Sequence, residues 1–106
     1  LAVLSDVLRN AKTPLAIVKR YAGSTDELVQ ADLALNPNLP PAVMERLARS
    51  PNRYVRMNLT WNEATPVSVL EGLGKDADDL VVRNALQALQ RRAKQAGGTA
   101  TTAVAP

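Results

Sequence analysis

The chain of 106 residues contains no cysteine and no histidine, and aromatic residues make up only 3% of it. The absence of cysteine excludes disulfide bonds and thiolate ligands for zinc or an iron–sulfur cluster. Without histidine, the chain lacks the commonest general base and the commonest metal ligand, and it cannot form a Ser-His-Asp triad. We therefore expect no enzymatic activity, no metal site and no cofactor.

Long apolar segments are also missing. No run approaches the ~18 apolar residues of a membrane-spanning helix, and no signal peptide is recognisable. The chain does not begin with methionine, which suggests a trimmed product or a piece of a longer protein. We expect a cytoplasmic protein without a membrane partner. Phenylalanine is absent, so the core should be aliphatic, which favours closely packed helices over a β-sandwich.

What the chain does contain is a regular interval. Pro14, Pro40 and Pro66 lie 26 residues apart. Apolar residues match at the same interval: Ile17, Val43 and Val69, then Val18, Met44 and Leu70, and then Tyr21, Leu47 and Leu73. Asparagine also recurs, at Asn10, Asn36 and Asn62. Such self-similarity is typical of a chain built from one repeated supersecondary unit.

Each unit is predicted to form two short helices. The first helix begins at the recurring proline, which is tolerated at the first helical position because its missing N–H has no partner there. Thr13 and Thr65 are expected to cap two of these helices. The second helix is expected to begin after a polar N-cap residue, and these residues are Ser24, Ser50 and Asp76.

The third unit is predicted to slip by one residue. The Val55-Arg56 pair, followed by Leu59, recurs as Val82-Arg83 with Leu86, at an interval of 27. We expect Arg56 and Arg83 to have a structural role, such as binding backbone carbonyl groups or an aspartate of the next unit.

These patterns predict an all-α fold. We expect a short, right-handed α-solenoid of about three two-helix repeats with a period of 26, plus a C-terminal capping helix. The helical repeat domain covers residues 1–93, divided into a half unit and three units at 1–12, 13–38, 39–64 and 65–93. The small and polar residues of 94–106 predict a flexible, low-complexity tail.

The segment 36–56 resembles the leucine-rich repeat variant family. It carries an Asn-Pro-Asn-x-Pro turn at 36–40, a Leu-Ala pair at 47–48 and a Val-Arg pair at 55–56. The resemblance covers roughly residues 3–86 and implies a bacterial helical solenoid in which α and 3₁₀ helices alternate. The family's unit is usually slightly shorter than 26 residues. The iron–sulfur cluster of one member type is not implied, because this chain has no cysteine.

Charge is unevenly distributed along the chain, whose net charge is +3. Residues 39–62 hold four arginines and one glutamate, whereas residues 63–83 hold five acidic and two basic residues. Arg20 and Arg46 occupy equivalent positions and should lie along one face. This pattern predicts either a basic stripe for a phosphate backbone or an acidic protein, or a solvated surface on which neighbouring units pair their charges.

Trp61 is predicted to be partly exposed, because residues of mixed polarity hold the equivalent positions. A partly exposed tryptophan serves either as an interface anchor or as a cover over the joint between units. Tyr21 and Tyr54 hold positions otherwise taken by leucine and are expected in the core. The residues predicted to bind a partner are Arg20, Arg46, Arg49, Arg53 and Trp61.

The predicted function is a protein–protein interaction module, in which a helical-repeat scaffold binds a protein partner on its curved surface. Two alternatives stay open. The same arginines could bind nucleic acid, although the modest net charge and scarce aromatic residues weaken this interpretation. The chain could also be a structural or self-association module of a larger bacterial protein.

Overall fold

The computed structural model describes the backbone of residues 2–104 and the side chains of residues 3–96. Over this part of the chain, the structure contains seven α-helices and no β-strand, which confirms the predicted all-α class. The helices are α1 (Ala2–Arg9), α2 (Leu15–Tyr21), α3 (Glu27–Leu33), α4 (Pro41–Leu47), α5 (Arg53–Trp61), α6 (Val67–Leu73) and α7 (Asp79–Val104). No helix in the described residues has the length and apolar character needed to cross a membrane.

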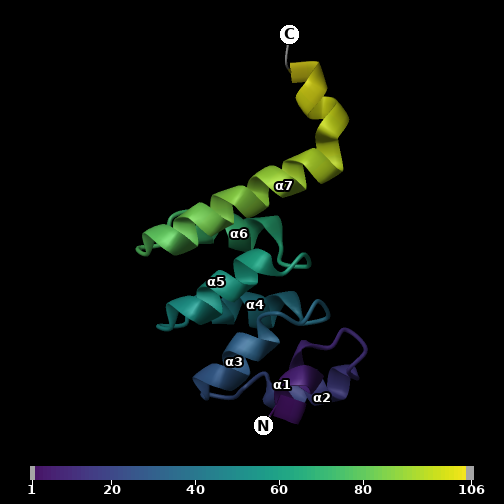
Figure 1. Ribbon diagram of the computed structural model, residues 1–106, viewed down its shortest axis with the longest axis vertical. Helices are drawn as coiled ribbons and strands as arrows, with labels where there is room; N and C mark the ends of the chain where they lie inside the picture. Colours follow the sequence, from purple (N-terminus) through teal and green to yellow (C-terminus); the bar gives the residue numbers. More distant parts are fainter. Residues whose placement is uncertain (1, 105–106) are drawn as a thin grey trace.

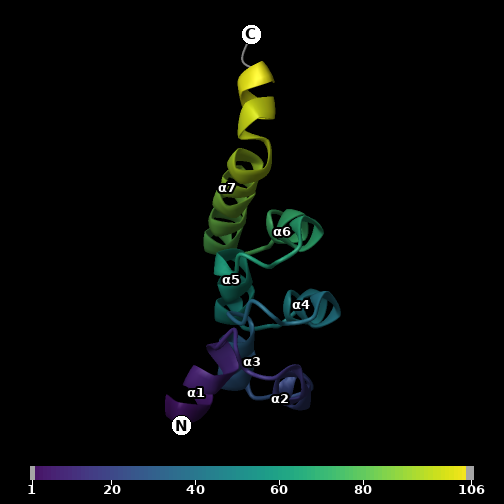
Figure 2. The ribbon, with the colours of Figure 1, turned by 90° about the vertical axis from the view of Figure 1, so that its right-hand side faces the viewer.

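The helices form two layers. Helices α1, α3, α5 and α7 follow one another in the first layer, and α2, α4 and α6 form the second layer beside it (Figures 1 and 2). Successive helices alternate between the layers as the chain advances along the longest axis of a molecule of 52 × 30 × 22 Å. The two ends of the chain therefore lie far apart (Figure 1).

Proline sets the start of the helices in the second layer. Helices α2, α4 and α6 follow Pro14, Pro40 and Pro66, and no side chain caps them. The prediction that Thr13 and Thr65 are caps is wrong. Their hydroxyl groups donate backward, to the carbonyl oxygens of Val7 and Leu59 in the preceding helix. These threonines therefore tie the loop to the helix before it.

Two successive side-chain turns lead into each of α3, α5 and α7. Ser24, Ser50 and Asp76, the predicted caps, each accept a hydrogen bond from the backbone N–H two residues later. The residue reached by that turn is the one that caps the helix, so the predicted caps lie two residues too early. The capping residues are Asp26, Asn52 and Asp78, whose side-chain oxygens accept hydrogen bonds from N–H groups of the first turn.

Buried asparagines join consecutive helices of the first layer. The Asn36 side-chain amide donates to the carbonyl oxygens of Leu8 and Asn10, at 2.8 and 3.2 Å. The Asn62 amide donates in the same way to Ala34 and Asn36, at 2.9 Å in both cases. Each donor thus binds carbonyl groups 28 and 26 residues earlier. Because buried carbonyl groups need a partner, these amides fix how the helices stack.

Helix α7 meets the equivalent carbonyl groups with arginine. The Arg91 guanidinium donates to the carbonyl oxygen of Thr60 at 3.5 Å, and the Arg92 guanidinium donates to that of Asn62 at 3.3 Å. Thr60 and Asn62 lie 26 residues after Ala34 and Asn36, which bind the Asn62 amide. The residue 26 after Asn62 is Ala88, which has no side-chain donor, so longer side chains from the next turn of α7 reach back instead.

The core is aliphatic, as the composition predicts, and the predicted slip in the last helix pair is wrong. Val81 and Ala85 are fully buried, whereas Leu86 is 48% exposed. The turn at 76–78 keeps an interval of 26 from the turn at 50–52, so α7 begins in the same register as α5. Arg83 is consequently exposed and does not repeat the contacts of Arg56. The segment 94–106, predicted to be a flexible tail, begins within α7, which extends to Val104; residues 105–106 lie outside the described backbone.

Candidate functional site

The five residues predicted to bind a partner are all exposed, but they lie on both layers. Arg20 lies on α2, Arg46 on α4, and Arg49 in the turn that follows α4. Arg53 begins α5 and Trp61 ends it. Arg46 and Arg49 line the same hollow, which Arg20, Arg53 and Trp61 do not line.

This arginine hollow lies between the α2–α3 turn and the end of α4. Its volume is about 420 Å³. Its lining contains two guanidinium groups and three hydroxyl groups but no carboxylate. The lining residues are Gly23, Ser24, Thr25, Gln30, Arg46, Leu47, Arg49 and Ser50. Hydrogen-bond donors therefore face the hollow from two different helix pairs.

Side chains from the first layer hold both turns that border the arginine hollow. The Gln30 amide donates to the carbonyl oxygen of Ser24 at 3.0 Å. Twenty-six residues later, the Arg56 guanidinium donates to the carbonyl oxygen of Ser50 at 2.7 Å. The turn that carries Arg49 is thereby tied to α5, so the hollow has fixed walls.

Arg56 also binds the next turn along the chain. Its Nε and Nη2 atoms donate to the two carboxylate oxygens of Asp76, at 2.8 and 3.1 Å. Both side chains are largely buried, with 15% and 11% exposed. This confirms the structural role predicted for Arg56, which binds a carbonyl group and an aspartate of the next helix pair. Bidentate, charge-assisted pairs of this kind are among the strongest hydrogen-bonded contacts.

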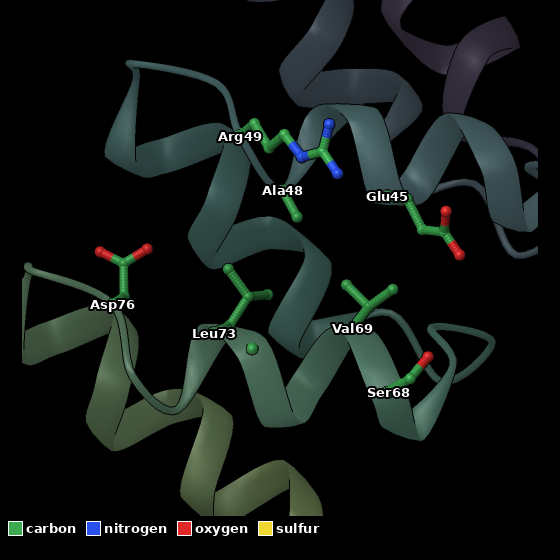
Figure 3. A pocket seen from close by; sticks show the side chains of 8 residues that line it. Glu45, Ala48, Arg49, Ser68, Val69, Leu73 and Asp76 are labelled. Atoms are coloured by element: carbon green, nitrogen blue, oxygen red, sulfur yellow. The ribbon is translucent and has the colours of Figure 1, made fainter.

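A second hollow of about 410 Å³ lies between α4 and α6. We call it the aliphatic hollow after Ala48, Val69 and Leu73 at its centre, although polar and charged side chains supply about half of its lining. Val69 and Leu73 point from α6 toward Ala48 at the end of α4 (Figure 3). Arg49 and Asp76 lie at one end of this hollow, and Glu45 and Ser68 lie at the other (Figure 3). Arg49 lines both hollows, which otherwise lie on opposite sides of α4, one toward the α2–α3 turn and the other toward α6.

Arg53 is already engaged within the chain. Its guanidinium donates to the Asp78 carboxylate at 3.1 Å, and its Cζ atom lies 5.3 Å from the centre of the Tyr54 ring. The contact with Tyr54, followed by the bond to Asp78, raises the pKa of Arg53. The pKa of Asp78 is lowered from its ordinary value of 3.8, chiefly by the backbone N–H of Val81. A partner that binds Arg53 would have to compete with this internal pair.

An exposed apolar ridge runs across the first layer, at the second residue of α3, α5 and α7. Leu28 is 79% exposed, Tyr54 is 55% exposed and Leu80 is 37% exposed. The prediction that Tyr54 lies in the core is therefore wrong, whereas Tyr21 packs against the core. Neighbouring residues of a helix point about 100° apart, so burial of the following valines, such as Val55, turns the ridge residues outward. Trp61 is 51% exposed, which confirms the prediction made from the mixed polarity of the residues at equivalent positions.

The hydroxyl side of the arginine hollow lies outside the predicted site. Ser24 is predicted only as a helix cap, and Thr25 and Gln30 have no predicted role in a site. The interval of 26 aligns residues within each unit, but it does not show which turn faces which helix of the next pair. That arrangement arises only when the helices stack, and no pattern in the sequence indicates it.

Comparison of the chain with protein-family models, with curated proteins and with solved structures yields no match. The functional inference therefore depends on the geometry of the two hollows.

Proposed function

We propose that the chain is a short, right-handed α-solenoid that acts as a protein–protein interaction module. Hydrogen bonds that recur at an interval of 26 support the repeat, as the amides of Asn36 and Asn62 illustrate. The bonds from Arg91 and Arg92 to the helix pair before them support α7 as the terminal cap. The resemblance of residues 36–56 to the leucine-rich repeat variant family supports a bacterial scaffold of that type, and we propose that it is cytoplasmic.

The observation that carries the proposal is the position of Arg49 between the two hollows. One hollow offers two guanidinium groups and three hydroxyl groups above apolar surface, and the other offers the aliphatic side chains of Ala48, Val69 and Leu73 between charged residues at its ends. Together they offer a partner both an anchor for charge and a place for an apolar side chain. Such a combination fits an extended protein segment that lies across several units of a solenoid.

Arg46 and Arg49 form the centre of the proposed surface. Arg20 lies one interval earlier on α2 and extends the surface along the same layer. Arg53 and Trp61 lie on the other layer, where Arg53 is paired with Asp78. A partner large enough to wrap around the molecule would reach Trp61, but the groove itself does not require it.

A pull-down from bacterial lysate with nuclease tests the proposal. We compare the wild type with an Arg46→Gln/Arg49→Gln variant and with a Lys12→Gln/Lys94→Gln variant. Both variants lose two exposed positive charges, but the lysines lie outside the two hollows. We expect protein partners that survive nuclease, that are lost from the arginine variant, and that are retained by the lysine variant.

Two other results would contradict the proposal. Loss of every partner on nuclease treatment would favour nucleic-acid binding through the arginines. A sedimentation coefficient that rises with protein concentration, with no heterologous partner retained, would favour a self-association module. Because all four substituted side chains are exposed, the variants should fold, and far-ultraviolet circular dichroism checks this.

A further inference from the structure

We propose that the arginine hollow binds the phosphoryl group of a phosphorylated serine or threonine. The peptide that carries this group would run past Arg49 and place a neighbouring aliphatic side chain in the aliphatic hollow. The inference rests on the proposed function, because it names the class of protein segment that the groove would accept.

The charge of the arginine hollow matches a phosphoryl group better than a single carboxylate. A phosphorylated side chain carries about −1.5 to −2 charges at neutral pH and presents three acceptor oxygens. Arg46 and Arg49 supply two positive charges, and no carboxylate lines the hollow. The salt bridges found among the described residues involve neither arginine. The guanidinium forks are therefore available for bidentate bonds to phosphoryl oxygens.

The opposite wall adds donors without charge. The hydroxyl groups of Ser24 and Thr25 line the hollow from the α2–α3 turn. The Ser24 hydroxyl oxygen accepts from the backbone N–H of Asp26, which leaves its proton available to donate. A tetrahedral anion would thus be held by guanidinium groups on one side and by hydroxyl groups on the other.

The dipole of α4 opposes anion binding, but it is the smaller effect. Arg46 and Arg49 lie at the C-terminal end of this seven-residue helix, where the backbone carries at most about half a negative charge. Two full positive charges on flexible side chains outweigh that partial charge.

The aliphatic hollow excludes the phosphoryl group and so sets the direction of the peptide. Glu45 and Asp76 line it together with Arg49, and Asp76 is paired with Arg56, so the hollow has no surplus of positive charge. Its aliphatic surface comes from Ala48, Val69 and Leu73. A Cβ atom built on Gly72 meets no other atom within 4 Å, so the wall of α6 is open there. An uncharged, branched side chain fits this environment.

A peptide explains the groove better than nucleic acid does. Single-stranded nucleic acid is usually held by aromatic side chains on which bases stack. No aromatic residue lines either hollow. One phosphate-sized cluster of donors beside an aliphatic hollow corresponds to one modified residue and its neighbour.

The test is a binding measurement with defined peptides. The probes are degenerate heptapeptide libraries with a fixed central phosphothreonine, threonine or glutamate, and a ten-nucleotide oligouridine is the fourth probe. Binding to the full ¹⁵N-labelled chain is followed by NMR, through the backbone signals and the Nε–H signals of arginine. We expect the phosphothreonine library to bind at least about tenfold more tightly than the other probes, as two charge-assisted bonds would provide, and to shift the signals of Thr25, Arg46 and Arg49.

Three variants sharpen the test. Arg46→Gln/Arg49→Gln should abolish the preference for phosphothreonine, whereas Lys12→Gln/Lys94→Gln should change it by less than about twofold, since screened charges outside the site contribute little. Gly72→Leu fills the aliphatic hollow and should weaken binding of peptides with a neighbouring aliphatic residue, while an all-alanine phosphopeptide binds as before.

Equal binding of the threonine and phosphothreonine libraries would overturn the inference, and so would tighter binding of oligouridine. A preference that survives in the arginine variant would overturn it as well. These failures are distinguishable from failure of the proposed function. Nuclease-resistant partners that depend on Arg46 and Arg49 would still support an interaction module, with an unmodified protein segment as its ligand.

Discussion

The side-chain amide of Asn62 donates a hydrogen bond of 2.9 Å to the backbone carbonyl oxygen of Asn36, which lies 26 residues earlier. The Asn62 side-chain oxygen also accepts a bond from the backbone N–H of Ala64. One buried side chain therefore shapes the turn after its own helix and fastens that turn to the previous helix. This dual role explains why asparagine, which carries a donor and an acceptor on a short side chain, occupies the position.

Replacing Asn62 with alanine should destabilise the fold strongly. The substitution leaves the buried carbonyl group of Ala34 without its side-chain donor, at a cost of about 1–3 kcal/mol. It also removes one of the two donors to the carbonyl group of Asn36, which keeps the N–H of Leu39. We expect the free energy of unfolding to fall by about 3 kcal/mol in urea titrations followed by circular dichroism.

Asn10 provides the matched control, because it stands at the equivalent position at the start of the array. It is exposed, and its side chain accepts a bond only from the nearby N–H of Lys12 among the described contacts. Asn10→Ala should lower the free energy of unfolding by less than about 1 kcal/mol. Equal effects at the two positions would refute the structural role assigned to the buried amide.

The pair of Arg56 and Asp76 should contribute more to stability than the exposed pair of Arg53 and Asp78. Arg56→Met leaves a largely buried carboxylate with the backbone N–H of Asp78 but without its positive counter-charge, and it removes the side-chain donor to the carbonyl oxygen of Ser50. We expect a loss of about 2–3 kcal/mol, below the 3–5 kcal/mol of fully buried pairs because water still reaches these groups. One double-mutant cycle combines Arg56→Met with Asp76→Asn, and a second combines Arg53→Met with Asp78→Asn. The coupling free energy should be large for Arg56 and Asp76 and below about 1 kcal/mol for Arg53 and Asp78. Similar couplings would contradict this ranking.

The all-helical class could be predicted because it depends on residues that recur along the chain. Proline precedes the helices of the second layer. The side chains of Asn36 and Asn62 shape the turns that follow α3 and α5 in the first layer. The prolines and asparagines are local features, and each repeats with similar neighbours. The structural role predicted for Arg56 is confirmed, but the recurrence that suggested it is not, because Arg83 is exposed.

The errors arose where an identity match did not coincide with equivalent packing. Tyr54 and Val55 are adjacent and both apolar, but only Val55 faces the core, because adjacent helical residues point in different directions. The Val82-Arg83 pair repeats the letters of an earlier pair without its register, which the turn at 76–78 fixes. The arginine hollow forms because the α2–α3 turn faces the end of α4. Which turn faces which helix is determined by how the helices stack, so it could not be predicted from the repeated residues.

Asp78 should make stability depend on pH in the acid range. Its pKa is lowered from 3.8 in the folded chain, first by the N–H of Val81, with further contributions from Leu80 and Arg53. A lowered folded pKa means stability that is fully present above the unfolded value and is lost as pH falls through the folded value. Asp78→Asn keeps a capping oxygen but cannot ionise. We therefore expect the wild type to be the more stable chain at pH 7 and its advantage to shrink below about pH 4.

Thermal unfolding between pH 2 and pH 7 measures this difference. The wild type and the Asp78→Asn variant are compared at each pH, so that the titration of other carboxylates cancels to first order. An advantage for the wild type that stays constant down to pH 2 would show that ionisation of Asp78 makes no contribution.

Gly72 and Gly74 should respond in opposite ways to the same added methyl group. Gly72 lies within α6, neither glycine has a positive φ angle, and a Cβ atom at Gly72 meets nothing within 4 Å. Gly72→Ala should therefore raise the free energy of unfolding by about 1 kcal/mol, because alanine loses less backbone entropy in a helix.

A Cβ atom at Gly74 would lie 3.3 Å from the carbonyl oxygen of Glu71 and 3.4 Å from the Leu86 side chain. Gly74→Ala should gain little or become destabilising, since that crowding offsets the entropic benefit. Urea titrations of both variants measure the contrast, and an equal gain at the two positions would show that Leu86 and α6 are not packed as closely as the structure indicates.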